Sequence, residues 1–386
     1  MTRIEVPNKT ATEVIQMVDL KGQYAKIKPS IDAAIQNCLD NATFIKGPQV
    51  AHFEAQLADY LGANHVVSCG NGTDALQIAM MALELKPGDE VIVPAFTYVA
   101  TAEAIGLLGL TPVMVDVDPL TFNLNRQLVE AAITPKTKLV VPVHLFGQCA
   151  DMEGILNICA AHQIAVIEDA AQAIGATYRF GDGTAKKAGT LGDMGTTSFF
   201  PSKNLGCYGD GGAVYTQSAG LARKARMIAN HGQEKKYIHE MIGINSRLDS
   251  LQAAILTEKL RYLDEYTHAR QKAASLYDAV LTEVAAVEIP YRADFSTHVF
   301  HQYTLKVPAQ HREGLQEYLQ QRKIPSMIYY PVPLNQQKAY QHLGRAVGSL
   351  AVTRELCKQV ISLPMHTEMT EAHITYISEA IATYFS

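Results

Sequence analysis

Short apolar runs alternate with helix-like segments between residues 64 and 216. Six of these runs predict strands, at 66–68, 90–94, 112–117, 138–143, 164–168 and 196–200. The runs that lie between helical segments are almost continuously apolar, which is typical of parallel strands buried on both faces. The Ala-, Leu- and Met-rich stretch 73–85 predicts a helix. Repeated strand–helix–strand units of this spacing predict a layered α/β domain with a mostly parallel central sheet flanked by helices.

The pattern changes after the apolar run at 212–215. Apolar residues from Leu260 to Val284 share one face of a predicted long helix. A predicted strand at 300–307 and predicted helices at 312–321 and 371–384 follow. We therefore expect a large α/β domain over residues 1–250, with 1–16 as an N-terminal extension, and a smaller C-terminal α+β domain over residues 251–386.

Charge and cysteine content exclude several classes of protein. The net charge of −5 gives no basic excess that would attract nucleic acid or an anionic membrane. No apolar run reaches the roughly 18 residues that span a bilayer. The six cysteines are scattered and lack zinc-ligand spacing. We expect a soluble cytoplasmic protein with no nucleic-acid partner, no membrane span and no metal.

The first candidate for chemistry is Gly70-Asn71-Gly72-Thr73-Asp74-Ala75, which joins a predicted strand to a predicted helix. Glycines let the backbone approach a ligand, and free N–H groups at a helix N-terminus attract anions. The segment also matches the dinucleotide pattern G-x-G-x-x-A, which requires an acidic residue at the end of the second strand. Pro94 ends that strand instead. A tight turn with a simple helix cap stays an alternative.

The second candidate is the pair Glu168-Asp169, at the end of a predicted buried strand. Open α/β sheets bind ligands at this edge. A carboxylate there can hold a protonated heterocyclic nitrogen, bind a metal or cap a helix. No other carboxylate or histidine pattern with ligand spacing accompanies the pair, which disfavours the metal.

The third candidate is Lys203, in a glycine-rich loop that follows the predicted strand 196–200. Desolvation lowers the pKa of a lysine and makes its amine a nucleophile for a carbonyl group. An ordinary surface lysine is the alternative.

Taken together, an anion cradle, a strand-end aspartate and a later loop lysine occur in the order used by fold type I enzymes that depend on pyridoxal 5′-phosphate (PLP). The cradle would bind the phosphate of the cofactor, the aspartate its pyridine nitrogen and the lysine its aldehyde.

From about residue 17 to the C-terminus the sequence resembles the DegT/StrS-type sugar-nucleotide aminotransferases. The resemblance is carried by five stretches: Gly70–Leu76, Pro94–Thr101, Glu168–Gln172, Ser198–Lys203 and Asn245–Asp249. It implies a fold type I transferase that acts as a homodimer with shared active sites. It also implies amino transfer from an amino acid, L-glutamate above all, to a nucleotide-linked ketosugar. Relatives that dehydrate sugars carry histidine in place of Lys203.

The resemblance also assigns roles to individual residues. Lys203 would hold PLP covalently and later move a proton, while Asp169 would keep the pyridine nitrogen protonated. The other implied cofactor contacts are Gln172 at the phenolic oxygen, Tyr98 on the ring face, and Gly72, Thr73, Asp74 and Ser198 at the phosphate, with Asn245 reaching the phosphate from the other subunit.

The segments 146–152 and 200–212 most resemble the branch that aminates C3 of UDP-2-acetamido-3-keto-hexuronic acids for surface polysaccharides. Arg247 lies two residues beyond Asn245, and its planar guanidinium suits a sugar carboxylate. An interface salt bridge is the alternative for this arginine. Tyr329 and Tyr330 are candidate substrate contacts, although many relatives carry histidine where Tyr329 stands.

Three other functions stay open at this point. The acceptor could be a neutral 3- or 4-keto-6-deoxy nucleotide sugar. The chain could be a non-catalytic regulator or sensor with the same fold, although such a protein has no need of Lys203. An NAD-binding oxidoreductase is the third alternative. His144 follows a predicted strand and either lines the site or is a satisfied core histidine.

Overall fold

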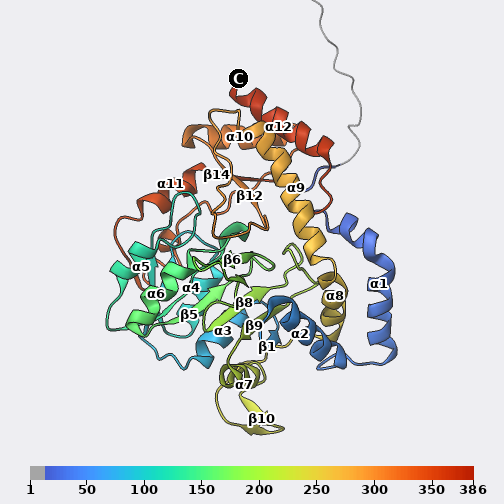
Figure 1. Cartoon of the computed structure of the whole chain (residues 1–386), viewed down its shortest axis with the longest axis vertical. Helices are drawn as coiled ribbons and strands as arrows, with labels where there is room; N and C mark the ends of the chain where they lie inside the picture. Colours follow the sequence, from blue (N-terminus) through green and yellow to red (C-terminus); the bar gives the residue numbers. More distant parts are fainter. Residues whose placement is uncertain (1–13) are drawn as a thin grey trace, which may run out of the picture.

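The computed structural model describes residues 14–386, and the expected N-terminal extension lies outside the described residues apart from 14–16. An eight-stranded sheet forms the centre of the larger part of the molecule (Figure 1). In spatial order its strands are β1 (His65–Cys69), β9 (Gly212–Thr216), β8 (Met194–Ser198), β5 (Ala165–Asp169), β4 (Thr137–Val140), β2 (Glu90–Pro94), β3 (Thr111–Val115) and β13 (Arg345–Ala346). β9 runs antiparallel to its neighbours β1 and β8, and the other pairs are parallel. The predicted mostly parallel sheet is confirmed.

Helices cover both faces of this sheet because strand side chains alternate between the faces. Val91 and Val93 of β2 pack in a cluster with α3 (Gly72–Ala82), α4 (Ala100–Leu107) and α7 (Ala219–Ile228). Ile92, between them, packs in a second cluster with α5 (Arg126–Ala132) and α6 (Met152–His162). The strands buried on both faces are the near-continuous apolar runs of the sequence.

Two further helices cover the β1–β9 end of the sheet. Phe53 and Leu57 of α2 (Pro48–Leu61) share a buried cluster with Leu256 of α8 (Ser250–Leu260) and with Tyr215 of β9. The N-terminal helix α1 (Leu20–Asp40) packs along α8, and Figure 1 shows α1 and α8 as neighbours at one side of the molecule. The packing of α8 therefore belongs to the larger part of the chain.

The C-terminal part has its own core. Its elements are α9 (Leu263–Leu281), β12 (Tyr303–Lys306), α10 (Ala309–Gln321), α11 (Ala351–Gln359), β14 (Val360–Leu363) and α12 (Glu371–Phe385). β12 and β14 pair antiparallel, and Tyr277, Leu305, Leu319 and Ile377 share one buried cluster. Because α8 packs on the larger part, we propose that the smaller domain begins at α9 rather than at residue 251.

The predicted long helix is confirmed as α9, but Leu260 belongs to the preceding helix α8 and Val284 lies beyond the end of α9. The chain forms two helices, α8 and α9, with a turn at residues 261–262 in which the Tyr262 amide donates to the Lys259 carbonyl. α8 packs against α2 and α1, whereas α9 packs against α12. The turn lets each helix bury its own apolar face against a different partner.

Short elements complete the chain. They are β6 (Thr177–Arg179), β7 (Ala185–Lys187), β10 (Gln233–Lys235), β11 (Ile238–His239) and the 3₁₀ turns Leu145–Gly147 and Leu334–Gln336. The β10–β11 hairpin projects from the molecule beside α7 (Figure 1). Within residues 14–386 we find no helix that is both long and apolar enough to cross a membrane.

Candidate active site

The N-terminus of α3 forms an anion cradle. Asn71 caps this helix, because its Oδ1 accepts a hydrogen bond of 2.8 Å from the Asp74 amide. In the described part of the chain no hydrogen bond engages the amides of Gly72 and Thr73, as expected for the first turn of a helix. A Cβ atom on Gly72 would lie 2.7 Å from the Cβ of Ser198, so the end of β8 lies directly against this turn. The first turn of α3 and Ser198 can therefore hold a phosphate together.

Asp74 is placed differently from the other cradle residues. Its Oδ2 accepts a 2.6 Å hydrogen bond from the Ser246 hydroxyl, and the Ser246 oxygen accepts one of 2.8 Å from the Gly70 amide. Both the amide and the carboxylate of Asp74 are thus engaged within the chain. Asp74 ties the segment around residue 246 to the cradle, and its contact with a cofactor stays a prediction.

Asp169 ends β5, at the carboxyl edge of the parallel strands. The side chain is buried, with Oδ2 accepting from the Thr101 hydroxyl at 3.0 Å and Oδ1 accepting from the Ala171 amide at 3.1 Å. These two donors fix the orientation of the buried carboxylate. Asp169 can therefore hold a protonated ring nitrogen.

Lys203 lies in the turn after β8 and is half-buried. Loss of water around its amine lowers the pKa of Lys203 to about 8, although the negative charge of Asp169 opposes the shift. Near neutral pH this amine is more readily deprotonated than an ordinary lysine, which suits attack on a carbonyl carbon. The predicted pair of a loop lysine and a strand-end aspartate is thus brought together.

An amide and aromatic rings line the region beside Asp169. Gln172 accepts a 2.7 Å hydrogen bond from the Phe146 amide and donates one of 3.1 Å to the Tyr330 hydroxyl. The Tyr330 ring lies 6.1 Å from the Tyr98 ring and 5.9 Å from the Tyr329 ring, centroid to centroid. Burial raises the pKa of Tyr329. Tyr98 is 57% exposed, which leaves its ring free to stack on a ligand.

Asn245 and Arg247 are the chain neighbours of Ser246, whose hydroxyl forms hydrogen bonds with Asp74 and Gly70 of the cradle. They are exposed, whereas Ser246 between them is buried against Asp74 and Gly70. Lys46 lies close to Arg247, because residue 45 forms an antiparallel bridge with Asp249. Partial burial and the positive charges of Arg247 and Arg226 lower the pKa of Lys46. Neither Lys46 nor Arg247 has an acidic partner among the described residues.

His144 is a satisfied core histidine, one of the two roles that the sequence allows. Its Nδ1 accepts from the Ala150 amide and its Nε2 donates to Glu168 at 2.8 Å, with both side chains fully buried. No group of three or more potential metal ligands occurs within residues 14–386. No sequence signal marked Thr101, three residues beyond Tyr98, as a partner of Asp169, or Ser246 as an anchor of Asp74.

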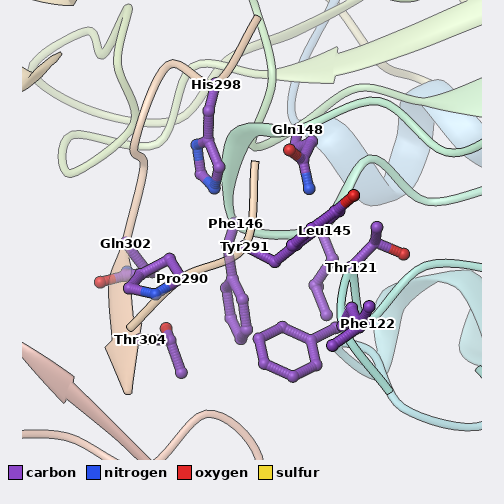
Figure 2. Close-up of a pocket in the computed structure, with 11 residues that line it drawn as sticks. Thr121, Phe122, Leu145, Phe146, Gln148, Pro290, Tyr291, His298, Gln302 and Thr304 are labelled. Carbon is purple, nitrogen blue, oxygen red and sulfur yellow. The ribbon is translucent and has the colours of Figure 1, made fainter. Parts of the chain in front are cut away.

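Two hollows in the described surface are lined by residues other than Lys203 and Asp169. Figure 2 shows the first, of about 10 Å³, between Phe122 and Phe146 on one side and Pro290 and Gln302 on the other. That volume is close to the minimum for one water molecule. The second, of about 290 Å³, is lined by Gln271, Ser275, Arg292, Ser296, Thr297, His298 and Phe300.

The residues present fit PLP. The amides of Gly72 and Thr73 suit its phosphate, the buried carboxylate of Asp169 suits its pyridine nitrogen, and the Lys203 amine suits its aldehyde. The absence of a Cβ on Gly72 is what allows Ser198 to approach the same turn.

Comparison with known proteins agrees with this fit. The model of the DegT/DnrJ/EryC1/StrS aminotransferase family matches residues 25–382. The chain is 48% identical to UDP-2-acetamido-2-deoxy-3-oxo-D-glucuronate aminotransferase of Pseudomonas aeruginosa, over 95% of this chain and 99% of that protein. It is 45% identical to UDP-N-acetyl-3-dehydro-alpha-D-glucosamine 3-aminotransferase of Acidithiobacillus ferrooxidans, over 96% and 98% of the two chains.

Among solved structures, S. venezuelae DesV in complex with a ketimine intermediate superposes with a TM-score of 0.93 at 38% identity, covering 97% of this chain and 99% of that chain. The chain therefore belongs to the DegT/DnrJ/EryC1/StrS aminotransferase family and is a PLP-dependent aminotransferase.

Proposed function

We propose that the protein transfers an amino group from L-glutamate to C3 of a UDP-linked 2-acetamido-3-keto-hexuronic acid, in the synthesis of surface polysaccharide such as lipopolysaccharide O-antigen. The relatives named above, which act on UDP-linked 3-ketosugars, support this substrate class. The observation that carries the acidic sugar is the pair of neighbouring exposed cations Arg247 and Lys46, which form no ion pair with an acidic side chain within residues 14–386. A carboxylate on the substrate would supply the missing negative charge.

Within this proposal each site residue has one task. When bound, PLP supplies an aldehyde that takes up the amino group and a ring that takes up an electron pair. Lys203 would hold the cofactor at its aldehyde and would carry a proton on its amine, and Asp169 would hold the protonated ring nitrogen. The remaining cofactor contacts are those of Gln172 with the phenolic oxygen, Tyr98 with the ring face, and Gly72, Thr73, Asp74 and Ser198 with the phosphate.

We further propose a homodimer in which each subunit completes the other's site. The alternation of exposed Asn245, buried Ser246 and exposed Arg247 supports this arrangement, because it aims two polar side chains away from their own subunit. In the dimer Asn245 reaches the partner's phosphate, while Arg247, Tyr329 and Tyr330 contact the sugar. All six cysteines are free and buried in the described structure, which suits the reducing cytoplasm as the place of action.

A substrate comparison tests the proposed function. The purified PLP-loaded protein is mixed with L-glutamate, and the resulting amino form is then offered either a UDP-2-acetamido-3-keto-hexuronic acid or a neutral dTDP-3-keto-6-deoxyhexose. We expect visible absorbance to change with glutamate alone and the acidic sugar to be aminated faster. Arg247→Gln should weaken use of the acidic sugar by roughly 2–5 kcal/mol, the range for a truncated charge pair, and leave the glutamate reaction unchanged.

Faster amination of the neutral sugar would contradict the acidic substrate and favour the alternative acceptor. Equal loss of both half-reactions in Arg247→Gln would make this arginine structural. A protein that binds PLP but accepts no amino group from any donor would act as a regulator, a role that the presence of both Lys203 and Asp169 disfavours.

A further inference from the structure

Glu168 is the residue of β5 before Asp169, and the two carboxylates point to opposite sides of the strand. Asp169 accepts from Thr101 and from the amide of Ala171, on the side of the site. The Glu168 side chain is fully buried on the other side, against the turn that precedes β8. Glu168 therefore contacts a different part of the molecule from Asp169 and serves a different purpose.

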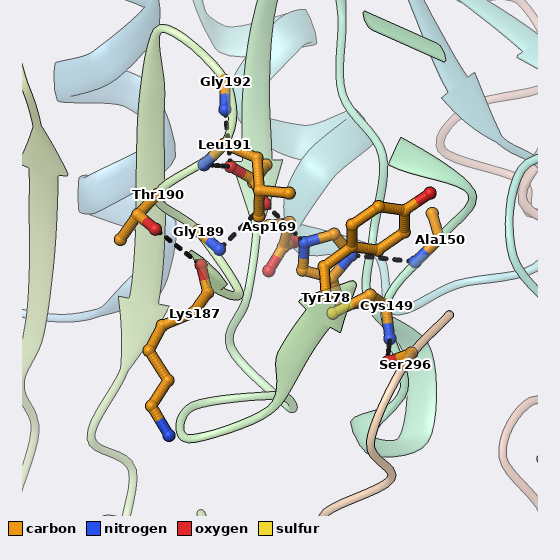
Figure 3. Close-up of polar contacts among 12 residues, drawn as sticks. Cys149, Ala150, Asp169, Tyr178, Lys187, Gly189, Thr190, Leu191, Gly192 and Ser296 are labelled. Atoms are coloured by element: carbon orange, nitrogen blue, oxygen red, sulfur yellow. Dashed lines mark hydrogen bonds and ion pairs between the residues drawn. The ribbon is translucent and has the colours of Figure 1, made fainter. Parts of the chain in front are cut away.

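Four N–H groups surround the Glu168 carboxylate. Oε2 accepts from the Gly189 amide and from His144 Nε2, both at 2.8 Å, while Oε1 accepts from the Leu191 amide at 2.6 Å and the Gly192 amide at 2.7 Å. Figure 3 shows the three backbone amides converging from one turn. Neither lysine nor arginine forms an ion pair with Glu168 in the described chain, so oriented dipoles hold this buried charge.

The hydrogen bonds of His144 fix its protonation. Because Nδ1 accepts from the Ala150 amide at 3.1 Å, the ring proton lies on Nε2, which donates to Glu168. The backbone amide of His144 donates to the Asp169 carbonyl at 3.0 Å. His144 also begins the turn whose Phe146 amide donates to Gln172. One neutral histidine thus connects Glu168 with two predicted cofactor contacts.

The turn at 189–192 leads into β8, which ends at Ser198 before Lys203. Its packing is tight: a Cβ on Gly195 would lie 2.0 Å from the Gly189 carbonyl oxygen, and one on Gly189 would lie 2.3 Å from the Tyr215 ring. Gly189 also has a φ of +87°, which glycine adopts without strain. The turn whose amides donate to Glu168 is therefore closely packed and has little room for another conformation.

We propose that Glu168 and His144 are positioning residues for amino transfer. Glu168 holds the neutral tautomer of His144 and the turn before β8, and so places Asp169, Gln172 and Ser198 relative to one another around the cofactor. The inference rests on the aminotransferase activity of the family and is independent of which sugar is the acceptor. Loss of either side chain would weaken PLP binding and change the orientation of the bound PLP.

Variants of both residues test this role. His144→Leu removes the donor and the acceptor, whereas His144→Gln can keep both. Glu168→Gln places an amide donor opposite backbone donors. A matched control is Thr304→Val in the smaller domain, which removes a buried side-chain hydrogen bond of 2.8 Å to Ser362. For each variant the cofactor-free protein is titrated with PLP, and melting temperature and the visible circular dichroism of bound PLP are recorded.

We expect Glu168→Gln and His144→Leu to weaken PLP binding by about 10- to 100-fold, the equivalent of one lost buried hydrogen bond, and to change the visible circular dichroism. His144→Gln should restore both properties, and Thr304→Val should lower only the melting temperature. If Glu168→Gln does not fold, the two His144 variants decide. PLP affinity and circular dichroism like those of wild type in His144→Leu would overturn the proposal, whatever the melting temperature. A wild-type protein that binds no PLP would instead contradict the cofactor assignment.

Discussion

Burial lowers the pKa of two lysines, Lys203 and Lys259, to about 8. A lysine with a strongly shifted pKa is a candidate for function, but the surroundings of the two differ. The Lys203 amine lies beside the anion cradle and interacts with the negative charge of Asp169. Lys259 is 1% exposed on α8, with its ammonium 5.1 Å from the centre of the Tyr208 ring. These surroundings support the proposed catalytic role of Lys203, and we expect Lys259 to act on stability alone.

The lowered pKa of Lys259 makes its contribution to stability depend on pH. Below about pH 8 the lysine is protonated in the folded and unfolded states, and the folded state bears the full desolvation penalty. Between about pH 8 and 10.4 the unfolded chain binds more protons than the folded one, so stability rises with pH as the penalty is relieved. The contribution of Lys259 is thus most unfavourable at and below neutral pH.

Lys259→Met should stabilise the protein at pH 7 by up to about 3 kcal/mol, because one pKa unit corresponds to about 1.4 kcal/mol. The gain should shrink as the pH rises from 8 to 10. Denaturant unfolding across this range measures it, with Lys272→Met on the exposed face of α9 as the control. A destabilised or pH-independent Lys259→Met would mean that the ammonium has a favourable partner.

At the scale of elements, the site depends on the close approach of α3 and β8. Gly72→Ala places a methyl group 2.7 Å from the Ser198 Cβ, which forces the helix N-terminus and the strand end apart. We expect PLP affinity to fall by about 10-fold or more while secondary structure is kept. Titration of the cofactor-free protein with PLP measures the change.

Gly220→Ala provides the control, because Gly220 also lies in the first turn of a helix, α7. A Cβ there would meet only the Ser218 hydroxyl, at 3.7 Å. This variant should bind PLP like wild type and gain up to roughly 1 kcal/mol from helix propensity. Equal PLP affinity in Gly72→Ala and Gly220→Ala would mean that the N-terminus of α3 is not part of the cofactor site.

Sequence patterns predicted the elements of the site well, because each signal is local. The glycines around the start of α3, the carboxylates at the end of β5 and the lysine after β8 all lie within a few residues of a strand boundary. The partners of these residues were not predictable, since the bonds from Thr101 to Asp169 and from Ser246 to Asp74 join distant segments. The break between α8 and α9 was missed because the apolar period continues through it while the packing partner changes.

At the scale of the whole molecule, exposed apolar side chains accompany the segments around the site. Phe44, Ile45, Phe200 and Ile242 are 46%, 51%, 52% and 87% exposed. Phe200 lies in the turn before Lys203, and residue 45 pairs with Asp249. Apolar residues that remain exposed beside a functional site are typical of an interface with another subunit. They support the proposed dimer, in which Arg247 would enter the partner's site.

A mixed dimer tests this sharing of residues. Lys203→Ala and Arg247→Gln subunits, each with little activity alone on a UDP-linked 3-keto-hexuronic acid, are unfolded together and refolded in equal amounts. If Arg247 serves the partner's site, each mixed dimer contains one intact site and one doubly defective site. Since about half of the dimers are mixed, turnover should recover to about a quarter of wild type. Dimers of two Lys203→Ala subunits serve as the control. No recovery in a preparation that contains mixed dimers would place Arg247 in the site of its own subunit.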